Sequence, residues 1–453
     1  MKILITGATG TLGREIGKVL ARKGHELFVI SRDKDSAKKK LPFPCQVIEA
    51  DLSKGSISKE ELKGIEGVVN LIGASVMGRW NEKRKNEIYK SRVDATRNLV
   101  QSLPEDLKVF VAGSAMGFYG EGGDRILTED LEAGHDFLAK VCVDWEAESA
   151  KAAGRHVFVR TGIVLSYSGA LKMMLPAFRN GLGGVLGRGQ NWMSWIHLED
   201  IVSMFVFAIE NENVNGPLNG CAPHPVTNKV FTKSLVHSLE VTQGPPVPLV
   251  ALKVLFGEMG SVIVGSTRGS AEKAEKLGFE FKYSFLDDAL KDLCEVFKGG
   301  GELYTQEQYL PLPRNEVFHF FQNPENLEKI TPDFLGFHIL ASSDKELQEG
   351  SLIDYRLKLY GVPMKWRTLI QDWQPPFKFT DSQVVGPYKK WVHRHSFEEL
   401  GSGTLMSDRV EYKLPMGFLG RIAGGYKVGK DIEKIFKYRR KAVRKMMFKD
   451  QGS

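Results

Sequence analysis

The chain contains 453 residues, 42% of them apolar and 26% charged, with a formal net charge of +7. This length exceeds what one hydrophobic core usually serves, so the sequence excludes a single small module and predicts two domains. The apolar fraction is that of an ordinary soluble globular protein. No apolar run is long enough to cross a bilayer and no signal-type segment opens the chain, so we expect a cytoplasmic protein.

The first half alternates strand-like apolar runs with helical stretches. Near-continuous hydrophobicity in each run indicates strands covered on both faces, as in the doubly wound parallel sheet of an α/β domain. The predicted strands span residues 2–6, 26–30, 46–50, 67–72, 108–112 and 156–160. The stretch 168–195 is then rich in glycine, methionine and tryptophan, and 226–294 looks mainly helical. We expect residues of about 165–195 and 220–298 to form a small substrate lobe.

The first strand ends in a glycine-rich turn, Thr6-Gly7-Ala8-Thr9-Gly10-Thr11-Leu12-Gly13. Glycines at this spacing permit a tight turn, a close approach to a pyrophosphate, and close packing of the next helix on the strand. Free amides and a partial positive charge at that helix start suit an anionic ligand. A dinucleotide site is therefore predicted, although such turns also occur without a ligand.

Ser31 and Arg32 follow the second strand, where the 2′ position of the adenosine ribose is recognised. An arginine beside a hydroxyl can bind a 2′-phosphate, so the pattern favours NADP(H) over NAD. Asp33 is the competing signal, since an acidic residue there would bind a free 2′-hydroxyl. Asp51 is placed to meet the adenine, and Asn70–Ala74 to lie beside the pyrophosphate and ribose, although ordinary turn chemistry would explain both.

These motifs together resemble the extended short-chain dehydrogenase/reductase family, the NAD-dependent epimerase/dehydratase group, over residues 1–298. A closer similarity is to its atypical epimerase-like, or cell-division-inhibitor-like, subgroup. The matching segments are the glycine turn, Asp51-Leu52, 70–74, 113–120 and 160–162, and for the subgroup Ser91-Arg92, 136–146, 181–184, 192–197 and 219–228.

The resemblance implies a Rossmann-type domain that binds NADP(H). The residues it assigns to the cofactor are Gly7, Thr9, Gly10, Thr11, Leu12, Gly13, Ser31, Arg32, Asp51, Leu52, Asn70, Leu71, Ile72, Gly73, Glu87, Arg92, Arg160, Thr161, Gly162 and Ile163.

The chain departs from this family at the proton-transfer pair. Short-chain dehydrogenases use Tyr-x-x-x-Lys, in which the lysine and cofactor lower the pKa of the tyrosine. Here Leu138 and Cys142 hold those places, counting back from Glu146, and Ala115 holds the usual hydroxyl position. Ordinary carbonyl reduction or sugar epimerisation by the family mechanism is therefore in doubt.

Three residues are the candidates for a substitute catalytic group. Ser114 can donate a hydrogen bond, Tyr119 lies on the loop that borders the nicotinamide in relatives, and Cys142 can act as a thiol acid or nucleophile if its pKa is lowered. The competing interpretations are a pocket wall for Tyr119 and a small buried apolar residue for Cys142.

A second domain is expected after the linker Gly299-Gly300-Gly301, over residues 302–453. Its pattern is an α+β one, with strands at 302–310, 351–360, 364–373, 377–385, 390–398 and 404–413, a helix at 314–322 and a long terminal helix. Such a curved antiparallel sheet, wrapped on a helix, encloses a core or a cavity.

This second part resembles the SRPBCC superfamily, the START and birch-allergen-like helix-grip fold. The similarity rests on 313–321, 323–327, 331–332, Gly386-Pro387-Tyr388, Trp391, His393, His395, 403–406 and 408–412. The superfamily implies an apolar cavity without fixed chemistry. The two histidines share one sheet face, but with no carboxylate or cysteine partner nearby in the sequence we predict no metal site.

Two functions remain open. The first is an NADP(H)-dependent epimerase or oxidoreductase-like enzyme with an atypical site, whose second domain holds an apolar small-molecule substrate. The second is a non-catalytic NADP(H) sensor or a carrier of lipids or other hydrophobic ligands. Without a nucleic-acid motif, the basic terminal helix indicates solvated surface, so no nucleic-acid partner is expected. A homodimer is compatible with the fold.

Overall fold

The computed structural model describes residues 1–359, 361–415, 420 and 425–448. The chain divides into two compact units, Met1–Lys40 with Cys45–Glu295, and Leu41–Pro44 with Val296–Ser453. Among the described residues, no helix combines the length and the apolar character needed to cross a membrane.

The first unit is built on a seven-stranded parallel sheet in the order β3-β2-β1-β4-β5-β7-β11. Its strands are β1 (Lys2–Thr6), β2 (Glu26–Ser31), β3 (Gln46–Glu49), β4 (Gly67–Asn70), β5 (Val109–Ala115), β7 (Arg155–Thr161) and β11 (Gly216–Gly220). The strand order reverses between β1 and β4, and at such a switch point the carboxyl ends of parallel strands leave a ligand crevice.

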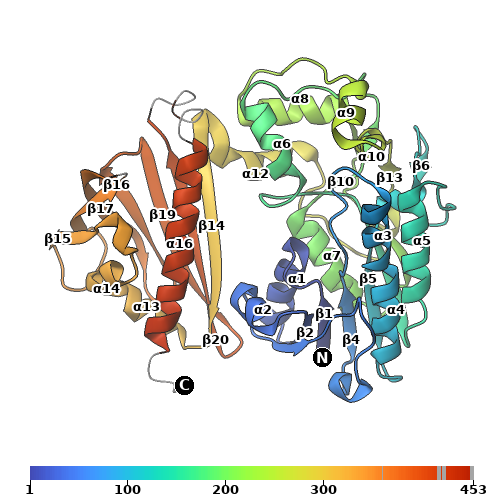
Figure 1. The fold of residues 1–453 in the computed structure, drawn as a ribbon, viewed down its shortest axis with the longest axis horizontal. Coiled ribbons are helices and arrows are strands. Elements are labelled where there is room, and N and C mark those ends of the chain that lie inside the picture. Colours follow the sequence, from blue (N-terminus) through green and yellow to red (C-terminus); the bar gives the residue numbers. More distant parts are fainter. Residues whose placement is uncertain (360, 416–419, 421–424, 449–453) are drawn as a thin grey trace. The chain divides into compact units, whose positions relative to one another are not determined.

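Helices cover both faces of this sheet (Figure 1). The helix α1 packs with α7, and α4 packs with α5. The helices of this layer structure are α1 (Thr11–Arg22), α2 (Lys34–Lys40), α3 (Glu82–Lys90), α4 (Val93–Ser102), α5 (Phe137–Ser149) and α7 (Leu198–Glu210). All four residues of β4 are buried, as expected for a strand with both faces covered.

Short elements complete the first unit. They are η1 (Lys59–Leu62), η2 (Met116–Tyr119), β6 (Ile126–Leu127), β8 (Ile163–Leu165), α6 (Ala170–Arg179), β9 (Trp192–Met193), β10 (Trp195–His197), β12 (Val226–Thr227), α8 (Asn228–Leu239), α9 (Leu249–Phe256), α10 (Met259–Val264), β13 (Arg268–Gly269), α11 (Glu272–Lys276) and α12 (Leu286–Cys294). The segment η3 (Glu295–Gly300) precedes the second sheet.

The second unit is an antiparallel seven-stranded sheet in the order β14-β20-β19-β18-β17-β16-β15. The strands are β14 (Gly301–Leu310), β15 (His338–Ser342), β16 (Leu352–Leu359), β17 (Val362–Gln374), β18 (Lys378–Val385), β19 (Lys390–Leu400) and β20 (Gly403–Lys413). Its helices are α13 (Arg314–Gln322), α14 (Pro324–Lys329), η4 (Asp333–Leu335) and α16 (Tyr426–Met447).

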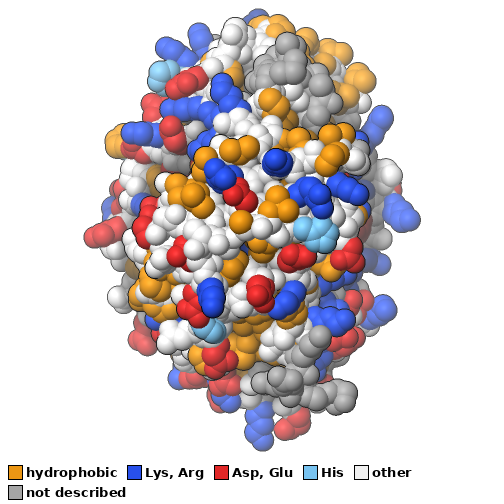
Figure 2. Space-filling model, turned by 90° about the vertical axis from the view of Figure 1, so that its left-hand side faces the viewer, with side chains coloured by type: hydrophobic (Ala, Val, Ile, Leu, Met, Phe, Trp, Pro, Cys, Tyr) orange, Lys and Arg blue, Asp and Glu red, His pale blue; other side chains and the backbone are white. Residues whose placement is uncertain are grey.

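The helix α16 lies along the second sheet (Figure 1). Its residues Ile432, Phe436 and Val443 are buried in the clusters that join the helix to the strands. Its exposed positions include many lysines, as the amphipathic pattern predicts: Lys427, Lys430, Lys434, Lys437, Lys441 and Lys445. Exposed apolar side chains of this unit include Leu340 and Val362. On the face drawn in Figure 2, orange side chains lie between charged ones of both signs.

The predicted fold class is confirmed: a doubly wound parallel sheet is followed by an antiparallel sheet with a long helix. The sequence analysis missed one strand of each seven-stranded sheet, besides the short strands outside them. The strand β11 begins Gly-Pro, which disfavours a strand, but it is an edge strand, where a missing N–H costs no ladder bond. The strand β15 is also an edge strand. Residue 360, the last of one predicted strand, lies outside the described residues.

We predict that Gly13→Ala destabilises the first unit by about 1–3 kcal/mol, although alanine normally favours a helix. An added Cβ would lie 2.6 Å from the Gly7 carbonyl oxygen and 2.7 Å from Ala8 Cα. Calorimetric unfolding of the full chain measures the change. Gly55→Ala is the control, because nothing lies within 4 Å of that Cβ. Equal stability of the two variants would contradict the packing argument.

Candidate functional site

The glycine turn joins β1 to α1 at the switch point of the first sheet. Gly7 has a φ of +67°, and a Cβ on it would lie 2.5 Å from the Leu71 carbonyl oxygen. The α1 helix starts at Thr11 after Gly10, which provides no side-chain cap. Thr9 and Gly10 are exposed. The turn therefore presents backbone at the surface, where an anion can approach uncapped amides.

The end of β2 carries Ser31, Arg32 and Asp33. The Asp33 carboxylate accepts a hydrogen bond from the Ser36 amide (2.8 Å), at the start of α2. Its backbone carbonyl accepts one from the Ser31 hydroxyl (3.1 Å). Arg32 is exposed, and no ion pair joins it to a described residue. Asp33 therefore has a local structural partner, which leaves Arg32 as the charged group free to meet a ligand.

Asp51 and Leu52 lie after β3. The Asp51 carboxylate accepts hydrogen bonds from the Ser53 hydroxyl (2.6 Å) and amide (3.1 Å), and these bonds, led by the hydroxyl, lower the pKa of Asp51. Leu52 is buried in the core cluster beside α4. The local structure of Asp51 is a capped turn, and its placement against an adenine stays a prediction.

Asn70 ends β4 and is completely buried. Its side-chain oxygen accepts from the Thr6 hydroxyl (2.6 Å), and its amide donates to the Thr96 hydroxyl (2.8 Å). The Trp145 indole also donates to Thr96 (2.9 Å). The Asn70 side chain thus ties β1 to β4 and α4, so its predicted contact with a cofactor would have to use the backbone.

Arg92 lies beside the loop that follows β4. A Cβ on Gly73 would be 2.8 Å from the Arg92 guanidinium carbon, so glycine permits this approach. The guanidinium donates to the Ile88 carbonyl (3.3 Å) and lies over the Trp145 ring. Burial lowers the pKa of Arg92. No described carboxylate pairs with it within 4.0 Å, so this cation is available to an anionic ligand.

The other predicted cofactor residues lie in the loop after β4, on α3, and at the end of β7. Leu71 and Ile72 are half-buried in the loop after β4. Glu87 on α3 is exposed and pairs with Arg84. Thr161 and Ile163 flank Gly162, where a Cβ would lie 2.4 Å from the Ser194 carbonyl oxygen, and the Ile163 amide donates to that oxygen (2.7 Å).

A buried polar network joins residues of β5, η2, α5 and β7. Arg160 on β7 makes a two-pronged ion pair with Glu146 on α5, with both N–O distances 3.0 Å. The Ser114 hydroxyl donates to Glu146 Oε1 (2.6 Å). The Arg160 guanidinium also stacks on the Phe118 ring, 3.3 Å from its centre. Arg160 and Ser114 are thus brought together, but by a carboxylate of the protein.

Tyr119 belongs to the same network and is 3% exposed. Its hydroxyl accepts from Arg160 (2.9 Å) and donates to Asn219 Oδ1 (2.8 Å). Burial, which outweighs the opposing effect of Arg160, raises the pKa of Tyr119 to about 12. In this arrangement the hydroxyl proton is already donated to a buried partner, which weakens the case for Tyr119 as an acid.

Cys142 lies on α5 in a buried cluster with Met116 and Phe118. Burial, followed by the charge of Glu146, raises the pKa of its thiol to about 11. Because the thiolate is the nucleophile, this environment disfavours nucleophilic chemistry. The geometry supports the interpretation of Cys142 as a small buried residue.

The second unit encloses a cavity of about 160 Å³ between its sheet and α16. Its walls are mainly aromatic and aliphatic, including Tyr355, Phe379 and Trp391. One part of the wall is polar and carries Asp381, His393 and His395. The cavity has the composition of a site for an apolar molecule that bears a polar group.

Sequence reasoning missed the partners that complete these sites. The sequence analysis used Glu146 only to locate the positions of the family's tyrosine and lysine, and named Asn219 only within the matching segment 219–228. A buried charge needs a partner, so an arginine in an apolar strand was a signal for a carboxylate such as Glu146. The partners Asp381 and Asp408 are far from the histidines in the sequence, and only the sheet register brings them near.

Three known family models match successive segments of the chain. Residues 3–219 match the model of the NAD dependent epimerase/dehydratase family, and residues 247–293 match a domain of unknown function, DUF1731. Residues 310–428 match the model described as polyketide cyclase / dehydrase and lipid transport. The chain belongs to the epimerase family and carries a second, SRPBCC-type domain.

Particular relatives resemble the first unit. Epimerase family protein YfhF of Bacillus subtilis is 38% identical over 300 residues, which are 65% of this chain and 98% of that protein. The chloroplastic SDR39U1 homolog of Arabidopsis thaliana is 36% identical over 65% of this chain and 87% of its own length. The crystal structure of human epimerase family protein SDR39U1 with NADPH matches with a TM-score of 0.58 and 28% identity, over 65% of this chain and 99% of that one.

We predict that Arg160→Met destabilises the first unit by about 3–5 kcal/mol, because it leaves the Glu146 carboxylate buried without its cation. The double change with Glu146→Gln should restore part of the loss. Lys140→Met, which removes an exposed ion pair with Asp144, should cost under about 1 kcal/mol. Urea unfolding measures all three. An Arg160→Met chain as stable as Lys140→Met would contradict the structural role of the pair.

Proposed function

We propose that the first unit binds NADP(H). The observation that carries this proposal is the glycine turn, in which Gly7 and Gly13 leave no room for a Cβ and the first amides of α1 lack a side-chain cap. A diphosphate suits these amides and the macrodipole of a twelve-residue helix. A relative of 28% identity has been crystallised with NADPH, which supports the same choice.

The residues that would hold the phosphates differ in role. Arg32, exposed at the end of β2, would bind the 2′-phosphate, and its neighbour Asp33 has its carboxylate directed to the start of α2. Arg92, with no described acidic partner within 4.0 Å, would neutralise charge near the loop after β4. When bound, NADPH supplies a hydride to an acceptor.

We propose that the protein is an epimerase-like or oxidoreductase-like enzyme. Its membership of the epimerase family supports this activity. The state of Ser114, Tyr119 and Cys142 favours a second candidate, a non-catalytic NADP(H) sensor. Both hydroxyls already donate to buried acceptors, and the thiol is held in an apolar cluster. Any proton donor within this network would have to break a hydrogen bond first.

The second unit is proposed to bind an apolar ligand, as substrate in the enzyme or as cargo in the sensor and carrier alternative. Its cavity and the match to a lipid-transport family model support this role. We further propose that the protein acts in the cytoplasm.

We predict that Arg32→Ala lowers NADPH affinity roughly 10- to 100-fold, the value of a lost charged hydrogen bond, and changes NADH affinity much less. Calorimetric titration of the full chain measures both. Lys63→Ala is the control. It also removes one positive charge, but Lys63 precedes β4 and so lies at the amino ends of the parallel strands, whereas Arg32 lies at their carboxyl ends. Equal losses for the two nucleotides would contradict 2′-phosphate recognition, and no binding of either nucleotide would sink the proposed function.

The enzyme and the sensor differ in turnover. The full chain with NADPH and a panel of carbonyl and enone compounds should oxidise NADPH if the enzyme proposal holds. Gly10→Asp, which places a carboxylate where the diphosphate binds, is the background control. Binding of NADPH without turnover above that control would favour the sensor.

We predict that Leu357→Trp, which fills the cavity wall, reduces the fluorescence of bound 1-anilinonaphthalene-8-sulfonate at least several-fold. Leu357 is buried and lines the cavity, whereas Leu340 is exposed in the same sheet, so Leu340→Trp is the control. Fluorescence titration of the full chain measures binding. Equal binding by both variants would contradict the cavity as the apolar site.

A further inference from the structure

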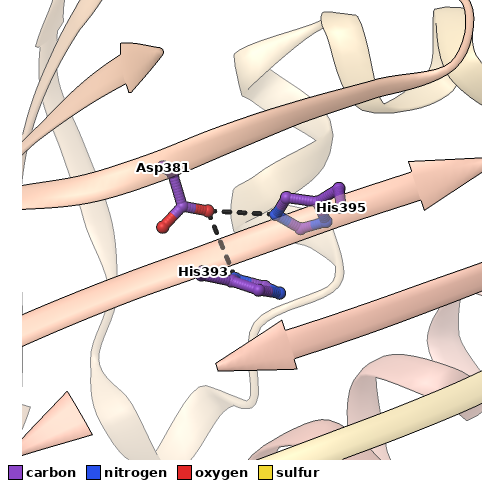
Figure 3. Close-up of side chains that lie close together, drawn as sticks. All are labelled: Asp381, His393 and His395. Atoms are coloured by element: carbon purple, nitrogen blue, oxygen red, sulfur yellow. Dashed lines mark hydrogen bonds and ion pairs between the residues drawn. The ribbon is translucent and has the colours of Figure 1, made fainter. Parts of the chain in front are cut away.

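Four ionisable side chains meet on one face of the second sheet. His393 and His395 both belong to β19 and point to the same face. Asp381 on β18 is the direct cross-strand neighbour of His393, and Asp408 on β20 is that of His395. Figure 3 shows Asp381 directed at both imidazole rings. Three adjacent strands thus deliver two carboxylates and two imidazoles to one point of the cavity wall.

The distances give the two carboxylates different positions. Asp381 Oδ2 lies 3.2 Å from His393 Nδ1 and 3.0 Å from His395 Nε2. Asp408 Oδ1 lies 2.9 Å from His393 Nε2 and 3.1 Å from His395 Nδ1. Each imidazole therefore presents one nitrogen to Asp381 and its other nitrogen to Asp408.

We propose that His393 Nδ1, His395 Nε2 and an Asp381 carboxylate oxygen bind a divalent transition-metal ion of the zinc class. In this cluster one possible ligand atom from each of the three residues lies within 4.8 Å of the other two. Nitrogen and oxygen ligands at about 2.0–2.1 Å from a tetrahedral ion are about 3.4 Å apart, close to the separations from Asp381. Two imidazoles and one carboxylate are a common ligand set for such ions.

Asp408 acts in this site as the positioning residue. With the metal on one nitrogen of each ring, the opposite nitrogen carries the proton and faces Asp408. A carboxylate behind the ligating histidine is the usual device that fixes its tautomer and orientation. Asp408 is 4% exposed, so it is held against both rings by the surrounding sheet. One carboxylate thus serves both histidines.

The alternative is a site without a metal, in which both imidazoles are protonated and neutralise the two carboxylates. The ring separation favours the metal. The ring centres of His393 and His395 are only 3.8 Å apart, a separation at which two imidazolium charges repel. Asp408 Oδ1 also faces one nitrogen of each ring, 2.9 Å from His393 Nε2 and 3.1 Å from His395 Nδ1, as expected for a carboxylate behind two ligating histidines. One divalent ion between neutral rings supplies both positive charges without that repulsion.

Three protein ligands leave a coordination position that faces the cavity, since Asp381, His393 and His395 all line it. The class of molecule that fits is apolar with an oxygen donor at one end. Arg439, whose Nε is buried without a hydrogen bond, lines the same cavity and suits a carboxylate head group. This assignment of ligand chemistry rests on the proposed apolar site, whereas the metal itself does not.

The test uses the untagged full chain, stripped with a chelator and titrated with Zn²⁺ and with Co²⁺. We expect one ion per chain by elemental analysis after dialysis, visible Co²⁺ absorption bands of a low-coordinate site, and a higher unfolding temperature of the second unit. Failure of the wild-type chain to bind an ion stoichiometrically overturns the proposal, whatever the variants do.

Variants separate ligands from neighbours. Asp381→Asn and His393→Gln should each weaken Zn²⁺ binding at least 100-fold, and Asp408→Asn about 10- to 100-fold with altered Co²⁺ bands. His338→Gln, an exposed histidine of β15 paired with Glu328, is the matched control and should bind normally. Equal binding by His393→Gln and His338→Gln overturns the assignment. NADPH and fluorophore titrations on the same samples show separately whether the proposed functions hold.

Discussion

The first unit depends on a close backbone approach between the turn after β1 and the loop after β4. At Gly7 the chain adopts a left-handed conformation against the Leu71 carbonyl, and at Gly13 the helix α1 packs on the turn itself. The hydrogen bond from Thr6 to Asn70 holds the two strand ends together. These contacts direct the start of α1 to the switch point of the sheet, where its uncapped amides suit an anionic group.

Leu138 and Cys142 hold the places of the family's tyrosine and lysine, and the polar groups near them form a structural network. Glu146 and Arg160 neutralise one another and bind Ser114 and Tyr119. Every polar group of this set has a partner inside the protein. The same contacts that make the region stable remove its acidic hydrogens from reach, so binding of a nucleotide is better supported than turnover.

The sequence predicted the layers of both units well, because apolar periodicity and glycine punctuation are local signals. It missed β11, whose Gly216-Pro217 start is tolerated only at a sheet edge, a position that no local pattern reveals. The predicted cofactor contacts of Arg160 and Asn70 stay predictions, and the structure adds that both side chains have buried protein partners. Partners such as Glu146 and Asp408 depend on packing and register, which a strand pattern does not specify.

The two buried polar clusters of the chain differ in one physical respect. In the first, ion pair and hydrogen bonds satisfy the charged groups, and aromatic rings such as Phe118 close over the guanidinium. In the second, two carboxylates and two imidazoles converge, a single Asp408 oxygen faces one nitrogen of each ring, and the group borders a cavity. A cluster closed over by aromatic rings stabilises a fold, whereas a group of nitrogen and oxygen ligands beside a cavity is suited to bind an ion. By that criterion the wall formed by β18, β19 and β20 is more open to a ligand than the network around Arg160.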